Sequence, residues 1–320
     1  MEKANHTGPI VALGEALVEF MPPIGQTMRD ANHWEKFAGG GPATYAAAVA
    51  RFGRPSALMT LVGRDPFSDY LVEALTQEGV DTSHVGHVDD RQIGLCYHEC
   101  IGGETSLIFH RQDSAATTLS PDHIDAEFIT RAAALHVPGT TMQISNSALA
   151  ASQRAMGVAR DAGIPVSFDP NIRAILGGAQ ASNAMEEALA TADVVTPTVE
   201  EAAAITGCED PIEAALELRA RGARMVAVTL AADGCVLARE ADETPVRCPG
   251  YTVDVVEPTG AGDVHAAAVM VGFLECWEVD RIGQFANAAG ALAVTAMGHL
   301  GRALPTLDQI HALVARGPTR

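Results

Sequence analysis

The chain has 320 residues, of which 48% are hydrophobic, so it can bury a large core in one or two α/β domains. Its net charge of −19 argues against nucleic acid or an anionic membrane as a partner, because both repel an acidic surface. The apolar stretches are shorter than the ~20 residues that span a bilayer, and the N-terminus does not resemble a signal peptide, so we expect a cytoplasmic protein.

The first third of the chain predicts short strands around two helices. Apolar and alternating patterns place strands at 10–13, 18–20, 33–37 and 57–62, and helices at 42–52 and 66–78. Short alternating segments then run from 84 to 110, beginning at 85–88, and are typical of antiparallel strands that do not join a parallel sheet. We expect 15–38 and 84–110 to form a small β-sheet lid.

From residue 120 onward the pattern changes to strand, helix, strand. The predicted strands are 134–137, 165–168, 194–196 and 225–230, and the predicted helices are 147–162, 181–190, 199–206, 211–221, 261–275, 281–297 and 306–315. This alternation predicts an α/β fold, a doubly wound and mostly parallel sheet flanked by helices, with the lid inserted in a single domain over 1–320. Ligands of such sheets bind beyond the carboxyl ends of the strands.

The most informative segment is Glu257-Pro-Thr-Gly-Ala-Gly-Asp263, which precedes an apolar helix. The amides of Gly260, Ala261 and Gly262 can point at one anion, and the positive end of the helix dipole adds to them. A carboxylate beside such a cradle, here Asp263, can take the proton from a hydroxyl that attacks phosphorus. The segment therefore favours phosphoryl transfer over an ordinary glycine turn at a helix start.

A second segment, from Ala38 to Gly53 and on to Asp65, contains the run Gly39-Gly-Gly41 before a helix. Together the two segments resemble the signatures of the ribokinase-like (PfkB) carbohydrate kinases, and the resemblance covers nearly the whole chain. It implies ATP and Mg²⁺ as cofactors, and it leaves open a monovalent cation such as K⁺ near the backbone carbonyl of Glu257. The only lysines, Lys3 and Lys36, are not in a Walker motif.

Four further segments look most like the 2-keto-3-deoxygluconate kinase branch of that family: Gly14–Phe20, Gly94–Tyr97, Phe109–Ala116 and Phe168–Arg173. The resemblance implies that the sugar is bound by Glu15, Gly39, Gly40, Thr44, Arg111 and Arg173. A sugar acid carries a carboxylate, and the two arginines can offer it bidentate donors. Fructokinases share the Asp-Pro-Asn-x-Arg run, so a fructokinase or another neutral-sugar or nucleoside kinase stays open.

On the nucleotide side the resemblance assigns Asn171, Thr198, Thr229, Gly234 and Asn287 to ATP, and Glu201 to Mg²⁺ through water. Several positions depart from the usual pattern: Thr44 and Thr198 replace Asn, Ala231 replaces Gly, Glu257 replaces Asp, His265 replaces Phe, and His299 replaces an acidic residue. A sugar-binding regulator without catalysis therefore stays open. A nicotinamide dehydrogenase is disfavoured, because Thr44 occupies the last glycine position of G-x-G-x-x-G.

Self-association is expected from the lid. Its strand edges and one apolar face would be uncovered, and the candidate apolar residues are Phe20, Trp34, Phe37 and Ile101. Related kinases often pair lid against lid, so we expect a homodimer. The six cysteines form no C-x-x-C pair and are expected to be free thiols.

Overall fold

The computed structural model describes residues 7–102, 104–172 and 179–319. A nine-stranded sheet crosses the molecule in the order β13-β12-β11-β10-β9-β8-β1-β4-β5. Its strands are β1 (Ile10–Leu13), β4 (Ser56–Val62), β5 (Val85–His87), β8 (Ala134–Pro138), β9 (Val166–Asp169), β10 (Val194–Val195), β11 (Met225–Thr229), β12 (Cys235–Arg239) and β13 (Val246–Cys248). Every pair of neighbouring strands from β10 to β5 is parallel, as the alternating pattern predicts.

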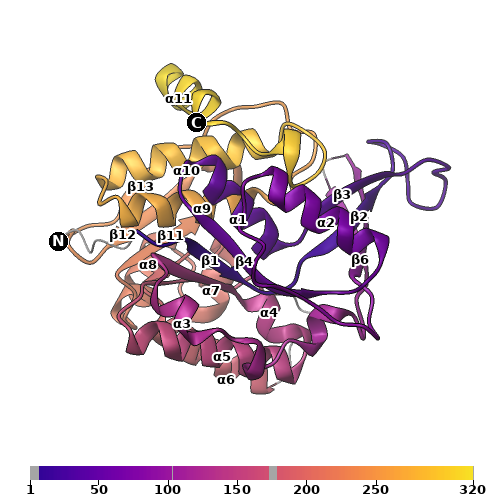
Figure 1. The fold of residues 1–320 in the computed structure, drawn as a ribbon. Helices are drawn as coiled ribbons and strands as arrows, with labels where there is room; N and C mark the ends of the chain where they lie inside the picture. The colour runs from indigo at the N-terminus through magenta and orange to yellow at the C-terminus, as the bar shows by residue number, and fades with distance from the viewer. Residues whose placement is uncertain (1–6, 103, 173–178, 320) are drawn as a thin grey trace.

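Helices cover both faces of this sheet (Figure 1). On one face lie α1, α9 and α10, and on the other lie α3, α5 and α6. The helices are α1 (Gly41–Arg51), α2 (Pro66–Gln77), α3 (Ala126–Thr130), α4 (Gly139–Ile144), α5 (Asn146–Asp161), α6 (Ala179–Thr191), α7 (Val199–Thr206), α8 (Pro211–Ala220), α9 (Ala261–Leu274), α10 (Val279–Ala293) and α11 (Leu307–Arg316). The fold is therefore the doubly wound α/β architecture expected from the sequence.

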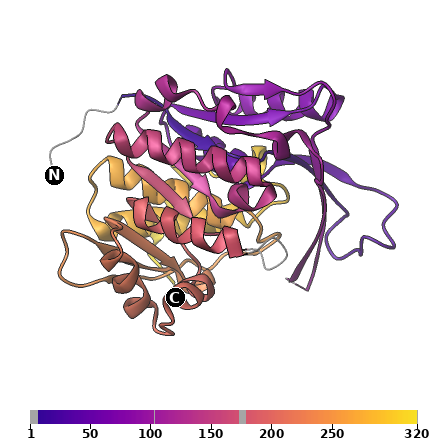
Figure 2. The ribbon, with the colours of Figure 1, turned by 90° about the horizontal axis from the view of Figure 1, so that it is seen from below.

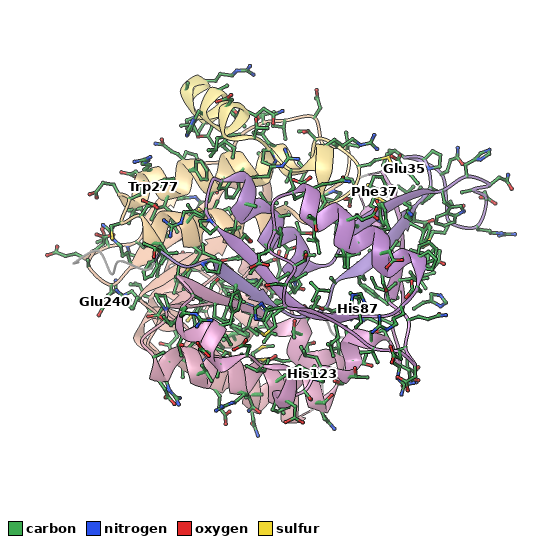
Figure 3. All side chains as sticks on the ribbon, in the orientation of Figure 1. Glu35, Phe37, His87, His123, Glu240 and Trp277 are labelled. Carbon is green, nitrogen blue, oxygen red and sulfur yellow. The ribbon has the colours of Figure 1, made fainter. Side chains whose placement is uncertain are left out.

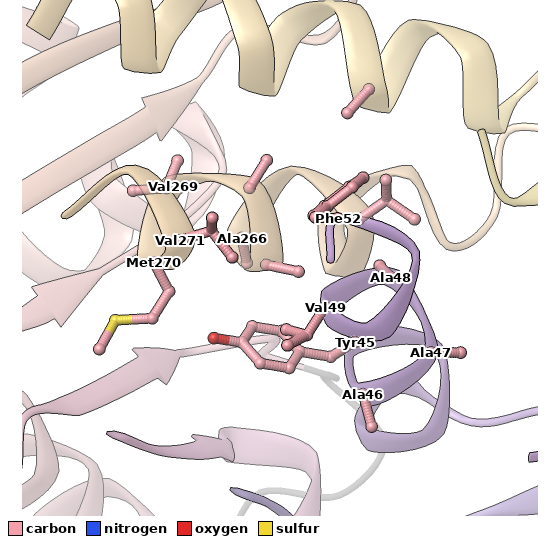
Figure 4. Packing of buried hydrophobic residues seen from close by; sticks show 14 of the residues in the cluster. Tyr45, Ala46, Ala47, Ala48, Val49, Phe52, Ala266, Val269, Met270 and Val271 are labelled. Atoms are coloured by element: carbon pink, nitrogen blue, oxygen red, sulfur yellow. The ribbon is translucent and has the colours of Figure 1, made fainter. Parts of the chain in front are cut away.

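Two helices that carry the sequence signatures pack against each other in the core. Helices α1 and α9 are apolar on nearly every side, and such helices must be buried all round. Figure 4 shows Tyr45 and Val49 of α1 facing Met270 and Val271 of α9. This packing fixes the start of α1 beside the start of α9, although the two segments are far apart in the sequence.

A separate four-stranded sheet projects from one end of the molecule, where its strands extend beyond the main body (Figure 2). Its order is β3 (Glu35–Gly39), β2 (Leu17–Met21), β6 (Gly94–Ile101) and β7 (Glu104–His110). Figure 3 places Glu35 and Phe37 of β3 at this end, opposite Glu240 and Trp277. We call this the small sheet.

The sequence prediction for 84–110 was wrong at its first strand. β5 pairs in parallel with β4, with Val85 opposite Thr60, and so forms the edge of the main sheet. The reason is that α2 separates β4 from β5, and a strand that follows a crossover helix returns parallel to the first strand. Within the small sheet, β2 and β6 are also parallel, whereas β2–β3 and β6–β7 are antiparallel.

Two further details differ from the predictions. Helix α10 ends at Ala293, short of the expected 297, because the Val294 carbonyl accepts hydrogen bonds from the amides of Val256 and Glu257. The ring of Phe37 is buried: Gly298 lies so close that an added Cβ would be 2.3 Å from Phe37 Cδ1. Trp34 and Ile101 are exposed, as expected for the apolar face of the small sheet.

Strands β12 and β13 were not predicted from the sequence. β12 and β13 run antiparallel at one edge of the main sheet, and β12 follows β11 through a tight turn that ends at Gly234. Within the described residues, no helix is long and apolar enough to cross a membrane. The six cysteines are free thiols.

Candidate active site

The signature residues gather beyond the carboxyl ends of the parallel strands. Glu15 follows β1, Asp169 ends β9, and Thr198 follows β10. The start of α9 closes this edge from the other side: Asp263, Gly262 and Pro258 line a channel with Asp169 and Thr198. Residues from four separate parts of the chain therefore meet at one place.

The helix start at α9 has the geometry of an anion cradle. Gly260 is the N-cap residue and adopts φ 84°, in the left-handed region that glycine enters without strain. Ala261 and Gly262 open the helix, and Asp263 lies in its first turn. The first amides of a helix have no partner within the helix, so these groups are available to an anion.

Gly41 brings α1 against Asp263. A Cβ added to Gly41 would lie 2.9 Å from Asp263 Oδ1, so any side chain there would displace the carboxylate. Asp263 lines both the channel and a second pocket beneath the small sheet. The carboxylate thus stands at the junction between the two spaces.

The pocket beneath the small sheet contains most of the predicted sugar residues. It is lined by Glu15, Leu17, Glu19, Gly40, Gly41, Pro42, Thr44, Cys96, His98, Leu107, Phe109, Arg111, Thr140, Asn171, Thr259, Asp263 and His299. The hydroxyl of Thr44 is buried and, within the described residues, makes no hydrogen bond. Gly39 does not line the pocket but lies beside Glu19 of its wall, since an added Cβ would be 2.3 Å from Glu19 Oε1. Arg173 falls outside the described residues.

Arg111 and Glu15 form an ion pair inside the pocket. Arg111 Nη1 lies 2.5 Å from Glu15 Oε2, and the guanidinium stacks on Phe109 at 4.3 Å from the ring centre. Burial raises the pKa of Glu15, and the charge and hydrogen bond of Arg111 act in the opposite direction. The arginine that the sequence offers to a substrate carboxylate therefore already has an anionic partner from the protein.

A third pocket lies on the other side of the α9 start, next to α10. Thr198, Thr229, Gly234 and Asn287 line it together with Ala231, Ala261, Gly262 and His265. A Cβ at Gly234 would lie 2.1 Å from the Cys248 carbonyl oxygen, so only glycine fits this turn. Ala231, which replaces the expected glycine, adopts φ 50° in an exposed turn.

Asn287 holds the wall of this pocket together. Its side-chain nitrogen donates to the carbonyls of Cys248 and Pro249 at 2.9 and 3.1 Å, and its Oδ1 lies 3.2 Å from His265 Nε2. Burial lowers the pKa of His265 to about 4, so that ring is neutral near pH 7. Asn287 is therefore buried and bonded to the protein, not a surface residue of α10.

Glu201 is bonded to the backbone on both sides of the channel. Its Oε2 accepts from the Thr198 amide at 2.8 Å, in a capping box at the start of α7, and its Oε1 accepts from the Ile172 amide at 2.6 Å. Asn171 adopts φ 37°, and its backbone amide donates to Asp169 Oδ1 at 3.1 Å. Carboxylates beside a phosphate site fit Mg²⁺, which takes one or two of them plus phosphate oxygens and water.

Sequence reasoning gave four polar residues no role at the site, and it noted a fifth, His299, only as a departure from the family pattern on the nucleotide side. Asp169 lines the channel, and its signal was present in the quoted Asp-Pro-Asn run. Glu19 and His98 alternate inward on strands of the small sheet, and His299 approaches from a loop after α10. Thr259 lines both the pocket and the channel. The pairing of these residues depends on tertiary contacts that no local pattern encodes.

Comparison with known proteins accounts for this arrangement. The model of the pfkB family of carbohydrate kinases matches residues 9–307. The chain belongs to the PfkB family of carbohydrate kinases. It is 31% identical to fructokinase-1 of Zea mays, covering 96% of this chain and 98% of that one, and 31% identical to a 2-dehydro-3-deoxygluconokinase of Thermoproteus tenax, covering 98% and 96%.

A solved structure agrees with the fold of this PfkB kinase. A candidate ribokinase II from E. coli, solved in complex with ATP and Mg²⁺, superposes with a TM-score of 0.90 at 27% identity, covering 97% of this chain and 99% of that chain. Membership of the family makes the chain a carbohydrate kinase, and the relatives differ among themselves in the sugar named.

Proposed function

We propose that this PfkB kinase transfers the γ-phosphoryl group of ATP to a hydroxyl of a neutral keto sugar of the fructose type. The observation that carries the proposal is the Glu15–Arg111 pair, which leaves the pocket without an unmatched cation among the described residues. Glu15 Oε1 is buried and, in the described part of the chain, accepts no hydrogen bond. A sugar hydroxyl would supply the missing donor, whereas a carboxylate would meet like charge.

In the proposed reaction Asp263 accepts the proton of the sugar hydroxyl as its oxygen attacks the γ-phosphorus. The new O–P bond forms while the bond from the γ-phosphorus to the β–γ bridging oxygen breaks, and ADP leaves. The amides of Gly260, Ala261 and Gly262 stabilise the negative charge that develops on the transferred group. Gly39, Gly40 and Thr44 would hold the sugar in line with it.

ATP would occupy the pocket beside α10, with its phosphates in the channel that leads to Asp263. Thr198, Thr229, Gly234 and Asn287 line the first space, and Asn171 lines the second. Glu201 and Asp169 would orient the water around Mg²⁺, which neutralises phosphate charge when it is bound. The neighbour solved with ATP and Mg²⁺ supports both cofactors.

A second candidate substrate is 2-keto-3-deoxygluconate, which the T. tenax relative supports. The specific observation in its favour is the raised pKa of Glu15, caused by burial. If a sugar acid binds, Glu15 can take up a proton and leave the charge of Arg111 to the carboxylate of the ligand. The two candidates therefore differ in the protonation of Glu15.

A panel of sugars in a coupled ADP-release assay tests the proposal. We expect turnover of fructose in the presence of Mg·ATP, and loss of turnover by a factor of about 10²–10⁴ in Asp263→Asn with sugar binding retained. Turnover of 2-keto-3-deoxygluconate alone would replace the first candidate by the second. If the protein binds ATP but releases no ADP with any sugar, a sugar-binding regulator without catalysis would be the remaining candidate.

A further inference from the structure

Three buried side chains connect the small sheet to the turn that begins α9. His299 lies between Glu19 of β2 and Glu257, which precedes the Gly260 turn. His299 Nδ1 is 2.6 Å from Glu19 Oε2, and His299 Nε2 is 3.4 Å from Glu257 Oε2. All three residues are buried. The pocket wall thus contains a Glu–His–Glu chain that the proposed reaction does not use.

The charges of Glu19, His299 and Glu257 follow from the short distances between their side chains. Burial lowers the pKa of His299, but the two carboxylates outweigh it and raise that pKa to about 10, so the ring is an imidazolium near pH 7. His98 of β6 faces the same group, with Nε2 3.6 Å from Glu19 Oε2, and burial lowers its pKa. His299 is therefore the one cation among the groups that face Glu19 and Glu257 in the described chain.

The His299 ring packs against the turn that contains Gly260. A Cβ on Gly260 would lie 3.1 Å from His299 Cδ2, so the ring is packed directly against the N-cap of α9. Glu257 Oε1 accepts a hydrogen bond from the Thr259 amide at 2.9 Å. Gly39 makes room on the other side, because a Cβ there would lie 2.3 Å from Glu19 Oε1. Residues 257–260 are therefore held in place by the contact between Glu257 and His299 and by the packing of the His299 ring against Gly260.

This arrangement does not fit a metal cation at Glu257. The resemblance to the family leaves a monovalent cation open near the backbone carbonyl of Glu257, and the side chain of the same residue is already matched by a protein cation at 3.4 Å and by an amide. A second cation would be repelled by the imidazolium.

We propose that His299 is a positioning residue, a cation supplied by the chain itself that ties Glu19 to Glu257 and holds the Gly260 turn in place for phosphoryl transfer without K⁺. The inference needs the kinase activity of the family but no particular sugar. It assigns a role to a residue that departs from the family pattern.

The first test uses the wild-type protein. With a sugar that is turned over, ADP release is compared in KCl and in tetramethylammonium chloride at equal ionic strength. We expect rates within about twofold. Activation by K⁺ of threefold or more would overturn the proposal.

Variants test the role of the charge. His299→Gln removes the cation and should lower kcat by roughly 10- to 100-fold, as expected when a reacting group is misplaced by about 1 Å, while the KM for Mg·ATP changes less than threefold. His123→Gln, in an exposed turn, is the matched control with unchanged kcat. In His299→Ala, KCl should restore kcat at least threefold, since the space between two carboxylates can then accept K⁺. Wild-type kcat in His299→Gln, or no response to K⁺ in His299→Ala, would contradict us.

A measurement without turnover keeps the proposal testable if these variants do not fold. In protein labelled with ¹⁵N-histidine, the ring signals of His299 should be those of an imidazolium at pH 8.5. In Glu257→Gln the same ring should lose its proton at a lower pH, because one of its two carboxylate partners is gone. A neutral His299 ring in the wild type at pH 8.5 would refute the proposal.

Discussion

Gly41 and Asp263 touch across the site: a Cβ on Gly41 would lie 2.9 Å from Asp263 Oδ1. The helices that carry these residues, α1 and α9, are fixed against each other by a shared apolar core. Gly41 therefore acts as a spacer for the proposed base. Its missing side chain leaves the carboxylate room at the junction of the pocket and the channel.

We predict that Gly41→Ala separates activity from folding. The added methyl meets the end of a side chain and no backbone atom, so Asp263 must shift while the fold remains. The expected loss in kcat is about 10²-fold, as for other misplacements near 1 Å, with a change in the free energy of unfolding below about 1 kcal/mol. Kinetics and urea unfolding of the same preparation measure both.

The matched control is Gly157→Ala in α5, where a Cβ would meet nothing within 4 Å. It should leave kcat unchanged and stabilise the helix by about 0.5–1 kcal/mol. If Gly41→Ala retains wild-type kcat, the contact with Asp263 has no catalytic consequence.

The Glu15–Arg111 pair predicts opposite responses for the two candidate substrates. With a neutral sugar, Glu15→Gln loses a charged acceptor for a hydroxyl, worth roughly 1.5–3 kcal/mol, so KM should rise by about 10- to 150-fold. With a sugar acid, the same variant frees Arg111 and KM should fall. Arg111→Ala should raise KM for the acid by a similar factor.

Steady-state kinetics on fructose and 2-keto-3-deoxygluconate with both variants decides between the candidates. A fall in KM for the acid in Glu15→Gln, together with a rise in Arg111→Ala, would favour the sugar acid. Equal KM values in the wild type and both variants would remove the pair from the sugar site.

Local sequence patterns were enough to predict the parallel core and the α9 start. The run Gly260-Ala-Gly-Asp263 combines a left-handed turn with a helix start, so its geometry follows from nearby residues. The partners of buried charges could not be predicted in this way. Arg111 was expected to face a ligand but meets Glu15, and Glu257 was considered for its carbonyl while its side chain meets His299. Such contacts join strands and loops far apart in the chain.

The small sheet predicts self-association. Its outer strand β7 exposes Ile108, at 49%, and Ile101 of β6 and Trp34, just before β3, are also exposed. Uncovered strand edges with apolar residues are usually paired or capped. We expect a homodimer through this sheet, seen by light scattering at micromolar protein, and weakened by Ile108→Lys. A monomeric mass for the wild type would contradict this.

His136 should make the protein sensitive to acid. The ring is buried, stacks on Tyr45 at 3.6 Å and lies 3.1 Å from Ser167 Oγ through Nδ1. Burial lowers its pKa from 6.5 to about 3. Above pH 6.5 the ring is neutral in both the folded and the unfolded chain, and its contribution to stability is fully present.

Between pH 6.5 and about 3 only the unfolded chain takes up this proton, so the free energy of unfolding should fall by about 1.4 kcal/mol per pH unit on account of His136. Urea unfolding at pH 7, 6, 5 and 4 measures the slope. In His136→Asn the slope should decrease by one proton, even though the variant starts from lower stability. An unchanged slope in His136→Asn would show that His136 titrates alike in both states.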